Sequence, residues 1–141
     1  MEDAVETLSV PGTVAGVRLA ILAFERFGRH HGVPGGTEWR VKLALDEILS
    51  NIVRHGTPEG RAAIELTFSI AGDVAAVEIV DASAPFDPLR AQPPDTTSAL
   101  RDRQPGGLGI ELVRKLMDAT SYERRGNLNY FVMKCGPHAD R

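Results

Sequence analysis

The sequence predicts an α/β (α+β) two-layer sandwich, in which helices cover one face of a mixed, mainly antiparallel sheet. Three observations lead to this prediction. Residues 37–56 keep apolar positions at three- and four-residue intervals, as an amphipathic helix does. Residues 62–70 alternate between apolar and polar side chains, as a strand with one buried face does. The turn sequences at 72–73 and 125–127 each separate two such strands and so predict hairpins.

The size and composition of the chain indicate one soluble domain over residues 1–141. Its 43% hydrophobic and 25% charged residues are ordinary for a globular protein, and no apolar run reaches the roughly 18–20 residues of a membrane-spanning helix. The acidic first segment argues against export, so we expect a cytoplasmic protein. A net charge of −3 with dispersed arginines argues against nucleic acid as the main partner. The single cysteine, Cys135, is predicted to be a core thiol on the last strand.

The N-terminal part of the chain predicts a strand followed by a helix. Residues 4–10 alternate weakly and form the strand, which ends at a Pro-Gly pair. Thr13 is expected to cap the helix, whose apolar spacing continues to about His31. Residues 32–36, which include a proline, then form a turn.

The second helix is the longest helical pattern in the chain. Thr37 is predicted to cap its start, and Gly56 lies where a left-handed residue would end it. Glu47 and Asn51 are four residues apart and therefore lie one turn above the other. The buried stripe is predicted to consist of Val41, Ala44, Leu45, Ile48 and Ile52.

The second half of the chain predicts two hairpins separated by a loop and a helix. The strand 74–80 returns from the first hairpin turn and ends at Asp81. Residues 85–107 hold five of the nine prolines and read as a long loop, which in a compact domain is usually a functional lid or disordered. A third helix follows, and the strands 119–123 and 128–134 form the last hairpin. The stripe of the third helix is predicted to be Ile110, Val113, Leu116 and Met117.

Three polar features together have the composition of a nucleotide phosphate site. Glycines at the start of a helix, as in residues 106–109, let backbone N–H groups approach an anion. The amide oxygen of Asn51 is a suitable ligand for Mg²⁺, and the Glu47 carboxylate can accept a proton one turn away. Asp81 ends a strand, where binding residues often lie. Each feature also has a purely structural interpretation, namely a solvated helix face, a loop-to-helix turn and a turn-forming aspartate.

The order of these motifs resembles the GHKL ATPase superfamily, and within it the stand-alone anti-sigma-factor serine/threonine kinases of the RsbW type. The segment LALDEILSNIVRHG is similar to the N-box of this family, VDASAPFDP to its adenine box, and GGLGIELVRKLMD to its glycine-rich box. The closing segment GNLNYFVMK also resembles the last strand of the family, so the similarity covers nearly the whole chain. It implies a histidine-kinase-like ATPase domain of Bergerat type with residues 85–107 as the ATP lid.

The resemblance implies ATP and Mg²⁺ as ligands. Glu47 corresponds to the general base of the family and Asn51 to its Mg²⁺ ligand. Asp81 corresponds to the aspartate that accepts a hydrogen bond from the amino group of adenine. Arg101 and Arg103 either reach the γ-phosphate when the lid closes or belong to a solvated loop. The predicted nucleotide-binding residues are Asn51, Asp81, Ser83, Pro85, Phe86, Arg101, Arg103, Gly106, Gly107, Leu108 and Gly109.

The adenine box departs from the family at one position. The family has glycine two residues after the aspartate, where this chain has Ser83. A side chain there restricts the approach of the backbone to the base, so we expect weakened nucleotide binding. His55 follows Asn51 by one turn and either touches the site or caps the helix. His30 and His31 complement the dipole of their helix and are not expected to bind a metal.

The resemblance implies an ATP-dependent protein serine/threonine kinase that is also an anti-sigma factor. Its partners would be a sigma factor held inactive and a STAS-type antagonist whose serine is phosphorylated, and it would form a homodimer through the first strand and helix. Three other interpretations are a nucleotide-gated binding module without catalysis, the catalytic half of a histidine kinase, and a switch protein acting on a regulatory phosphatase. The N-terminal thirty residues leave no room for the phosphoacceptor helices of a histidine kinase.

Overall fold

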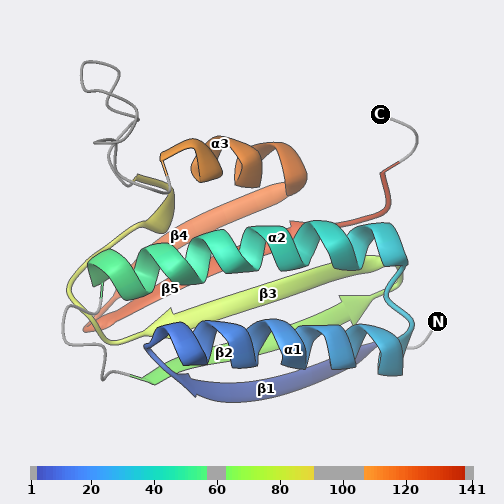
Figure 1. Cartoon of the computed structure of the whole chain (residues 1–141), viewed down its shortest axis with the longest axis horizontal. Helices are drawn as coiled ribbons and strands as arrows, with labels where there is room; N and C mark the ends of the chain where they lie inside the picture. Colours follow the sequence, from blue (N-terminus) through green and yellow to red (C-terminus); the bar gives the residue numbers. More distant parts are fainter. Residues whose placement is uncertain (1–2, 57–62, 91–106, 139–141) are drawn as a thin grey trace.

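The computed structural model describes residues 3–56, 63–90 and 107–138, and in this part of the chain five strands form one sheet covered by helices on one face (Figure 1). The strand order is β1-β2-β3-β5-β4. In chain order, the elements are β1 (Ala4–Pro11), α1 (Val14–His31), α2 (Gly35–Asn51), β2 (Ala63–Ala71), β3 (Val74–Asp81), α3 (Gly107–Leu116), β4 (Ala119–Arg125) and β5 (Leu128–Cys135).

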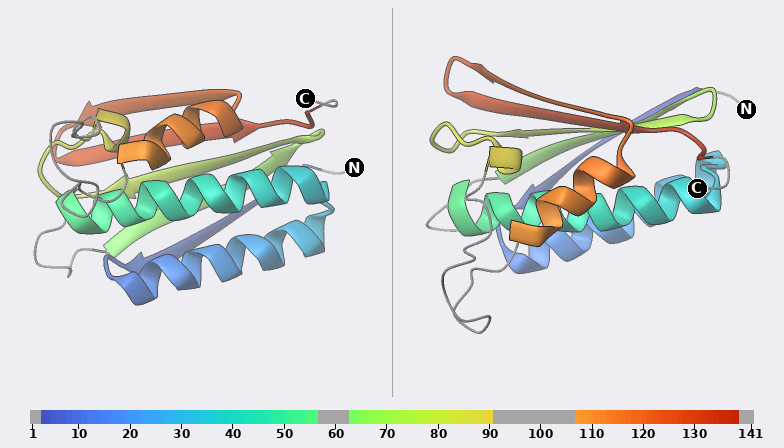
Figure 2. Two further views of the ribbon diagram at one scale, coloured as in Figure 1. Left: turned by 45° about the horizontal axis from the view of Figure 1, so that its top comes forward. Right: turned by 90° about the horizontal axis from the view of Figure 1, so that it is seen from above.

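The two-layer α/β architecture predicted from the sequence is confirmed. All three helices lie on the same side of the twisted sheet, with α2 between α1 and α3 (Figure 2). Each of the four strand pairings is antiparallel, so the described sheet contains no neighbouring parallel pair, where the sequence predicted a mixed sheet. Strand β5 inserts between β3 and β4, because the chain crosses to the edge of the sheet through α3 before it turns back.

The first strand and helix have the predicted boundaries. Thr13 is the N-cap of α1, and its hydroxyl oxygen accepts a hydrogen bond from the Gly16 N–H at 3.1 Å. Gly32 ends the helix in the left-handed conformation, with φ of 73°, and its N–H donates to the Gly28 carbonyl. Such a cap favours glycine, which has no Cβ to oppose a positive φ.

Helix α2 differs from its prediction at both ends. It begins two residues earlier, because the Pro34 carbonyl already accepts the first helical hydrogen bond, from the Glu38 N–H at 2.8 Å. Thr37 is therefore no cap; it is buried in the first turn and accepts a hydrogen bond from Arg40 Nη2 at 3.4 Å. The α-helix ends at Asn51, and a π-helical turn (Ile52–Gly56) replaces the predicted left-handed stop at Gly56.

The core lies between the helices and the inner face of the sheet. The predicted stripe of α2 is fully buried there, as are the alternate residues of β2 and of the last strand, including Cys135. Phe24 and Phe27 of α1 pack against Phe68 of β2, with ring centroids 5.2 and 5.8 Å apart. In the apolar stripe predicted for the third helix, Ile110, Val113 and Met117 are buried, while Leu116 is half-buried.

The hairpin strands extend slightly beyond their predicted ends, and the predicted long loop contains one short helix. This is a 3-10 turn over Pro88–Arg90, while residues 91–106 lie outside the described part. None of the described helices combines the length and the hydrophobicity that crossing a membrane requires.

Candidate active site

The predicted site residues gather at one end of the molecule. The C-terminal end of α2, the end of β3, the start of α3 and the start of β5 all lie at this end (Figure 1). Asp81, the last residue of β3, pairs with Asn129 at the start of β5. The candidate site is thus assembled from segments that lie far apart in the sequence.

Glu47 contacts the start of α3. A Cβ atom added to Gly109 would lie 2.1 Å from both Cδ and Oε1 of Glu47, so a side chain at this position would require the carboxylate or α3 to shift. The Oε2 atom of Glu47 is buried and has no hydrogen-bond partner among the described residues. Burial raises the pKa of the Glu47 carboxyl above its ordinary value of 4.5, with Arg54 opposing this shift and Asp46 adding to it. An unpaired carboxylate with a raised pKa has the properties of a general base.

Asn51 lies one turn further along and is buried. Its side-chain Nδ2 donates to the Pro88 carbonyl at 3.4 Å, and its Oδ1 accepts a hydrogen bond from Arg54 Nη2 at 3.2 Å. The first contact joins α2 to the segment that follows β3. An amide oxygen fits a Mg²⁺ ion chemically, but the guanidinium of Arg54 would have to move away first. Because the side chain of Arg54 is exposed, it has space to do so.

Asp81 is buried, and the described residues hold its carboxylate through one oxygen. Oδ1 accepts hydrogen bonds from the backbone N–H of Ser83 at 3.0 Å, from the Ser83 hydroxyl, and from Asn129 Nδ2 at 3.1 Å. Oδ2 accepts none from the described residues. The serine that replaces the expected glycine therefore folds back onto the aspartate. It helps to fix the carboxylate while Oδ2 stays available to a ligand.

Asn129 is the centre of this network, and the sequence analysis did not identify it. Its Nδ2 also donates to the Ala84 carbonyl at 3.0 Å, and its Oδ1 accepts from the Phe86 N–H at 3.2 Å. The same oxygen accepts hydrogen bonds from the Tyr122 hydroxyl at 2.5 Å and from Arg124 Nη1 at 3.2 Å. Arg124 Nη1 in turn donates to the Ser83 carbonyl at 2.7 Å. The last hairpin thus determines the shape of the loop after Asp81.

The Pro-Phe pair of the predicted adenine box lies on the edge of the site. Phe86 is half-buried against the core, whereas Pro85 is exposed. The ring of His55, from the π-helical turn, lies 5.9 Å from the Phe86 ring between centroids. His55 therefore contacts this loop, which was one of its two predicted positions.

The glycine-rich segment is described only in part. Gly107 and Leu108 form the first turn of α3 with Gly109, so backbone N–H groups that lack helical partners lie beside Glu47. Arg101, Arg103 and Gly106 lie outside the described residues, and their predicted contacts stay predictions.

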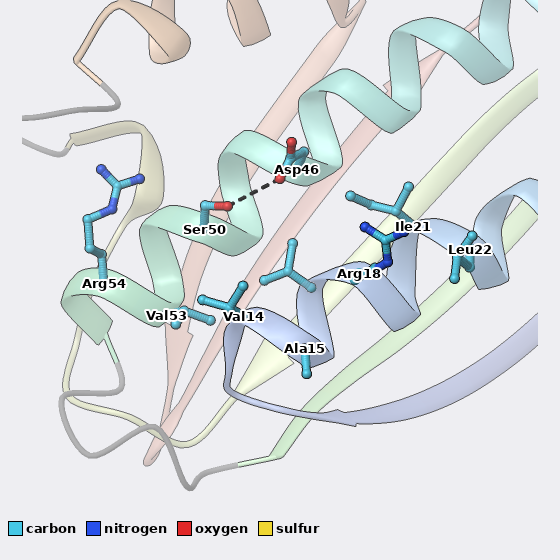
Figure 3. A pocket seen from close by; sticks show the side chains of 10 residues that line it. Val14, Ala15, Arg18, Ile21, Leu22, Asp46, Ser50, Val53 and Arg54 are labelled. Carbon is cyan, nitrogen blue, oxygen red and sulfur yellow. Dashed lines mark hydrogen bonds between the residues drawn. The ribbon is translucent and has the colours of Figure 1, made fainter.

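A separate hollow lies on the other side of α2, between this helix and α1. Val14, Ile21 and Val53 contribute apolar side chains to it, and Arg18 and Asp46 are polar residues in its wall (Figure 3). The Ser50 hydroxyl donates to Asp46 Oδ1 at 3.2 Å across one turn of α2. Since Glu47 contacts α3, this hollow is distinct from the candidate site.

Comparison with known proteins identifies relatives of this chain. Residues 10–134 match the model of the histidine kinase-like ATPase domain family. Over 134 residues the chain is 33% identical to the serine/threonine-protein kinase BtrW of Bordetella bronchiseptica, and the match covers 94% of each chain.

Two solved structures share the fold at low sequence identity. The structure of the RsbU and RsbW domains of Rv1364c from Mycobacterium tuberculosis matches with a TM-score of 0.65 and 11% identity, over 94% of this chain and 32% of that one. The present chain thus spans about a third of that protein chain. The SiaB–SiaC complex from Pseudomonas aeruginosa matches with a TM-score of 0.57 and 14% identity, over 92% of this chain and 88% of the other. Through its matched residues and its fold, the chain belongs to the family of histidine kinase-like ATPase domains.

Proposed function

We propose that this protein is an ATP-dependent protein serine/threonine kinase of the anti-sigma-factor type. The observation that carries the proposal is the buried Oε2 of Glu47, which has no hydrogen-bond partner among the described residues and lies beside the glycine-rich start of α3, one turn from Asn51. The identity of one-third to a named serine/threonine-protein kinase over almost the whole chain supports the same activity.

Each residue has a separate role in this proposal. The Oδ2 atom of Asp81 accepts a hydrogen bond from the amino group of adenine, while its Oδ1 stays bound to Asn129 and Ser83. The backbone N–H groups at the start of α3 bind phosphate oxygens. Asn51 Oδ1 is the protein ligand of Mg²⁺, which neutralises the phosphate charge when it is bound. Arg101 and Arg103 are proposed to approach the γ-phosphate.

Glu47 acts on the phosphate acceptor. Its carboxylate accepts the proton of an incoming serine hydroxyl while the serine oxygen forms a bond to the γ-phosphorus and the bond to the ADP oxygen breaks. The proton then passes to solvent, and ADP leaves. The raised pKa makes this carboxylate a stronger base than an exposed glutamate.

The proposed partners are a sigma factor and a STAS-type antagonist, of which the antagonist carries the accepting serine. A homodimer is proposed through β1 and α1. Strand β1 is the outer strand of the sheet, pairs with β2 alone, and exposes Val5 at 67% of its surface. An open strand edge with an exposed apolar side chain is suited to a second copy. Sedimentation equilibrium of the purified chain tests this, and a monomer at micromolar concentration would refute it.

The decisive experiment combines ATP titration with a phosphotransfer assay. We expect Glu47→Gln to bind ATP·Mg²⁺ as the unaltered protein does but to lose phosphotransfer to a STAS-domain protein by about 100-fold or more, the usual range for a lost general base. The matched control is Glu111→Gln, which changes an exposed carboxylate on α3 and should retain activity. Failure to bind ATP at millimolar concentration would refute the proposal.

A second candidate function is a nucleotide-gated binding module, or a switch protein of the same fold acting on a regulatory phosphatase. The position of Ser83 favours it, because the hydroxyl adds bulk in the adenine box where the family has glycine. If the protein is only a binding module, Glu47→Gln should leave its affinities for partners and nucleotide unchanged. Neither the unaltered protein nor the variant should then transfer phosphate.

A further inference from the structure

A second cluster of ligating side chains lies at the other end of the sheet. Asp118, Cys135 and His138 bring a carboxylate oxygen, a thiol sulfur and an imidazole nitrogen within 4.8 Å of one another. Cys135 ends β5 six residues after Asn129, so the cluster lies roughly 20 Å along the strand from the candidate active site. The proposed kinase reaction uses none of these groups.

The backbone holds the cluster together. Asp118 follows α3, and its N–H donates to the Lys134 carbonyl at 2.9 Å, next to Cys135. Asp118 Oδ2 accepts the Gly136 N–H at 2.7 Å, and Oδ1 contacts His138 Nε2 at 2.8 Å. A carboxylate oriented by a backbone N–H is typical of the surroundings of metal ligands. The ligands are therefore arranged in advance from two segments, although Asp118 and Cys135 are 17 positions apart in the sequence.

The cluster has the chemistry of a site for a borderline-soft cation. Sulfur, nitrogen and oxygen ligands together suit Zn²⁺, and the Cys-x-x-His spacing of Cys135 and His138 resembles the short spacers between zinc ligands. The Cys135 thiol is fully buried, and its sulfur lies 3.6 Å from the Leu116 carbonyl oxygen and 3.5 Å from the Gly136 carbonyl oxygen. The Asp118 side chain is 43% exposed, so this ligand of the cluster is accessible from solvent.

Two features must change when an ion binds. Ligands of a tetrahedral zinc ion lie roughly 3.3–3.8 Å apart, so His138 Nε2 and Asp118 Oδ1 must separate and give up their hydrogen bond. His138 follows the last strand and belongs to no helix or strand, so it can shift. The thiol proton passes to solvent as the sulfur–metal bond forms. Arg40 is a nearby cation, and its Nη2 donates to the Gly136 carbonyl at 3.4 Å.

We infer that Asp118, Cys135 and His138 form a site for Zn²⁺, with water as the fourth ligand. The ion would connect the end of α3 to the segment after β5. It would thereby fix the last described residues of the chain against the sheet. The site would stabilise the fold independently of nucleotide.

Titration of the metal-free full chain with Co²⁺, followed by Zn²⁺, tests the inference. We expect a thiolate-to-cobalt charge-transfer band that saturates at one equivalent and disappears when Zn²⁺ displaces the cobalt. His138→Ala should weaken Zn²⁺ binding at least about 10-fold, and Asp118→Asn should weaken it while keeping an oxygen acceptor for Gly136. His30→Ala removes an exposed imidazole elsewhere and should leave the affinity unchanged.

Cys135→Ser should abolish the band, but this residue is buried and the variant can fail to fold. His138 belongs to no helix or strand, so its replacement avoids that difficulty, and circular dichroism of His138→Ala verifies its fold. A wild-type protein without the band overturns the inference, and so does an affinity that His138→Ala leaves unchanged.

Discussion

Gly109→Ala tests the contact between α3 and the predicted general base. The added Cβ would lie 2.1 Å from Cδ and Oε1 of Glu47, whereas ordinary van der Waals contact begins at 3.4 Å. The carboxylate must therefore retreat by about 1.3 Å or α3 must shift, and overpacking of this kind typically costs about 1–3 kcal/mol. Against this, alanine is favoured over glycine in a helix by up to about 1 kcal/mol. We expect a net loss of roughly 1–2 kcal/mol in the free energy of unfolding.

A double-mutant cycle with Glu47→Ala separates the clash from the helix propensity. Glu47→Ala removes the three atoms that lie nearest to the new Cβ, so in that background Gly109→Ala should stabilise the protein by up to about 1 kcal/mol. The matched control is Gly35→Ala in the first turn of α2, where an added Cβ meets nothing within 4 Å. It should stabilise the protein in both backgrounds.

Urea denaturation of the four proteins of the cycle measures these free energies. The sign of the Gly109→Ala effect should reverse between the two backgrounds. An equal effect in both would refute the contact between Glu47 and α3, and with it the arrangement on which the proposed base depends.

Three further predictions concern stability. Asn129→Ala should cost at least about 2 kcal/mol because it leaves the partners in the Asp81 network unsatisfied, while Asn127→Ala in the exposed hairpin turn should change the urea midpoint little; equal midpoints would contradict the network. Since the folded pKa of Glu47 is raised above 4.5, its favourable contribution to stability is complete below that pH and is lost as the pH rises through the folded value. Glu47→Gln should therefore be as stable as the wild type near about pH 4 and more stable than the wild type near about pH 8. If urea denaturation gives the same difference in the free energy of unfolding between the two proteins at both pH values, the raised pKa is disproved. Thr13→Ala should cost about 1 kcal/mol in the free energy of unfolding through the lost cap of α1, and Thr13→Ser should restore most of it; a thermal melt that does not distinguish the two variants would exclude the cap.

The sequence predicted the fold well where periodicity was strong. Strict alternation in β2 placed Ile64, Leu66, Phe68 and Ile70 in the core, because the two faces of that strand meet different surroundings. The start of α2 was predicted wrongly, since the pattern gives no sign that the Pro34 carbonyl accepts the first helical hydrogen bond.

The candidate site was predictable only through local motifs. Asn129 was missed, although strict alternation with Phe131 and Met133 places a polar side chain on the inward face of β5, and that is a recognisable anomaly. The Asp118–Cys135 contact left no such signal, because it depends on how the turn after α3 pairs with Lys134. Contacts between side chains on different strands depend on the register of the strands. The spacing of residues within one segment does not contain that information.

The place of β5 in the middle of the sheet has a consequence for synthesis on the ribosome. Strand β3 pairs with β5 from Ala75 opposite Cys135 to Asp81 opposite Asn129, yet Cys135 follows Asp81 by 54 residues. At roughly 5–20 residues per second, the growing chain leaves this edge of β3 unpaired for roughly 3–11 s. Until then Asp81 lacks its amide partner and the apolar face of β3 is incompletely covered. The nascent protein is therefore vulnerable to aggregation and accessible to chaperones in that interval, and it acquires a complete Asp81 network only after β5 has been translated.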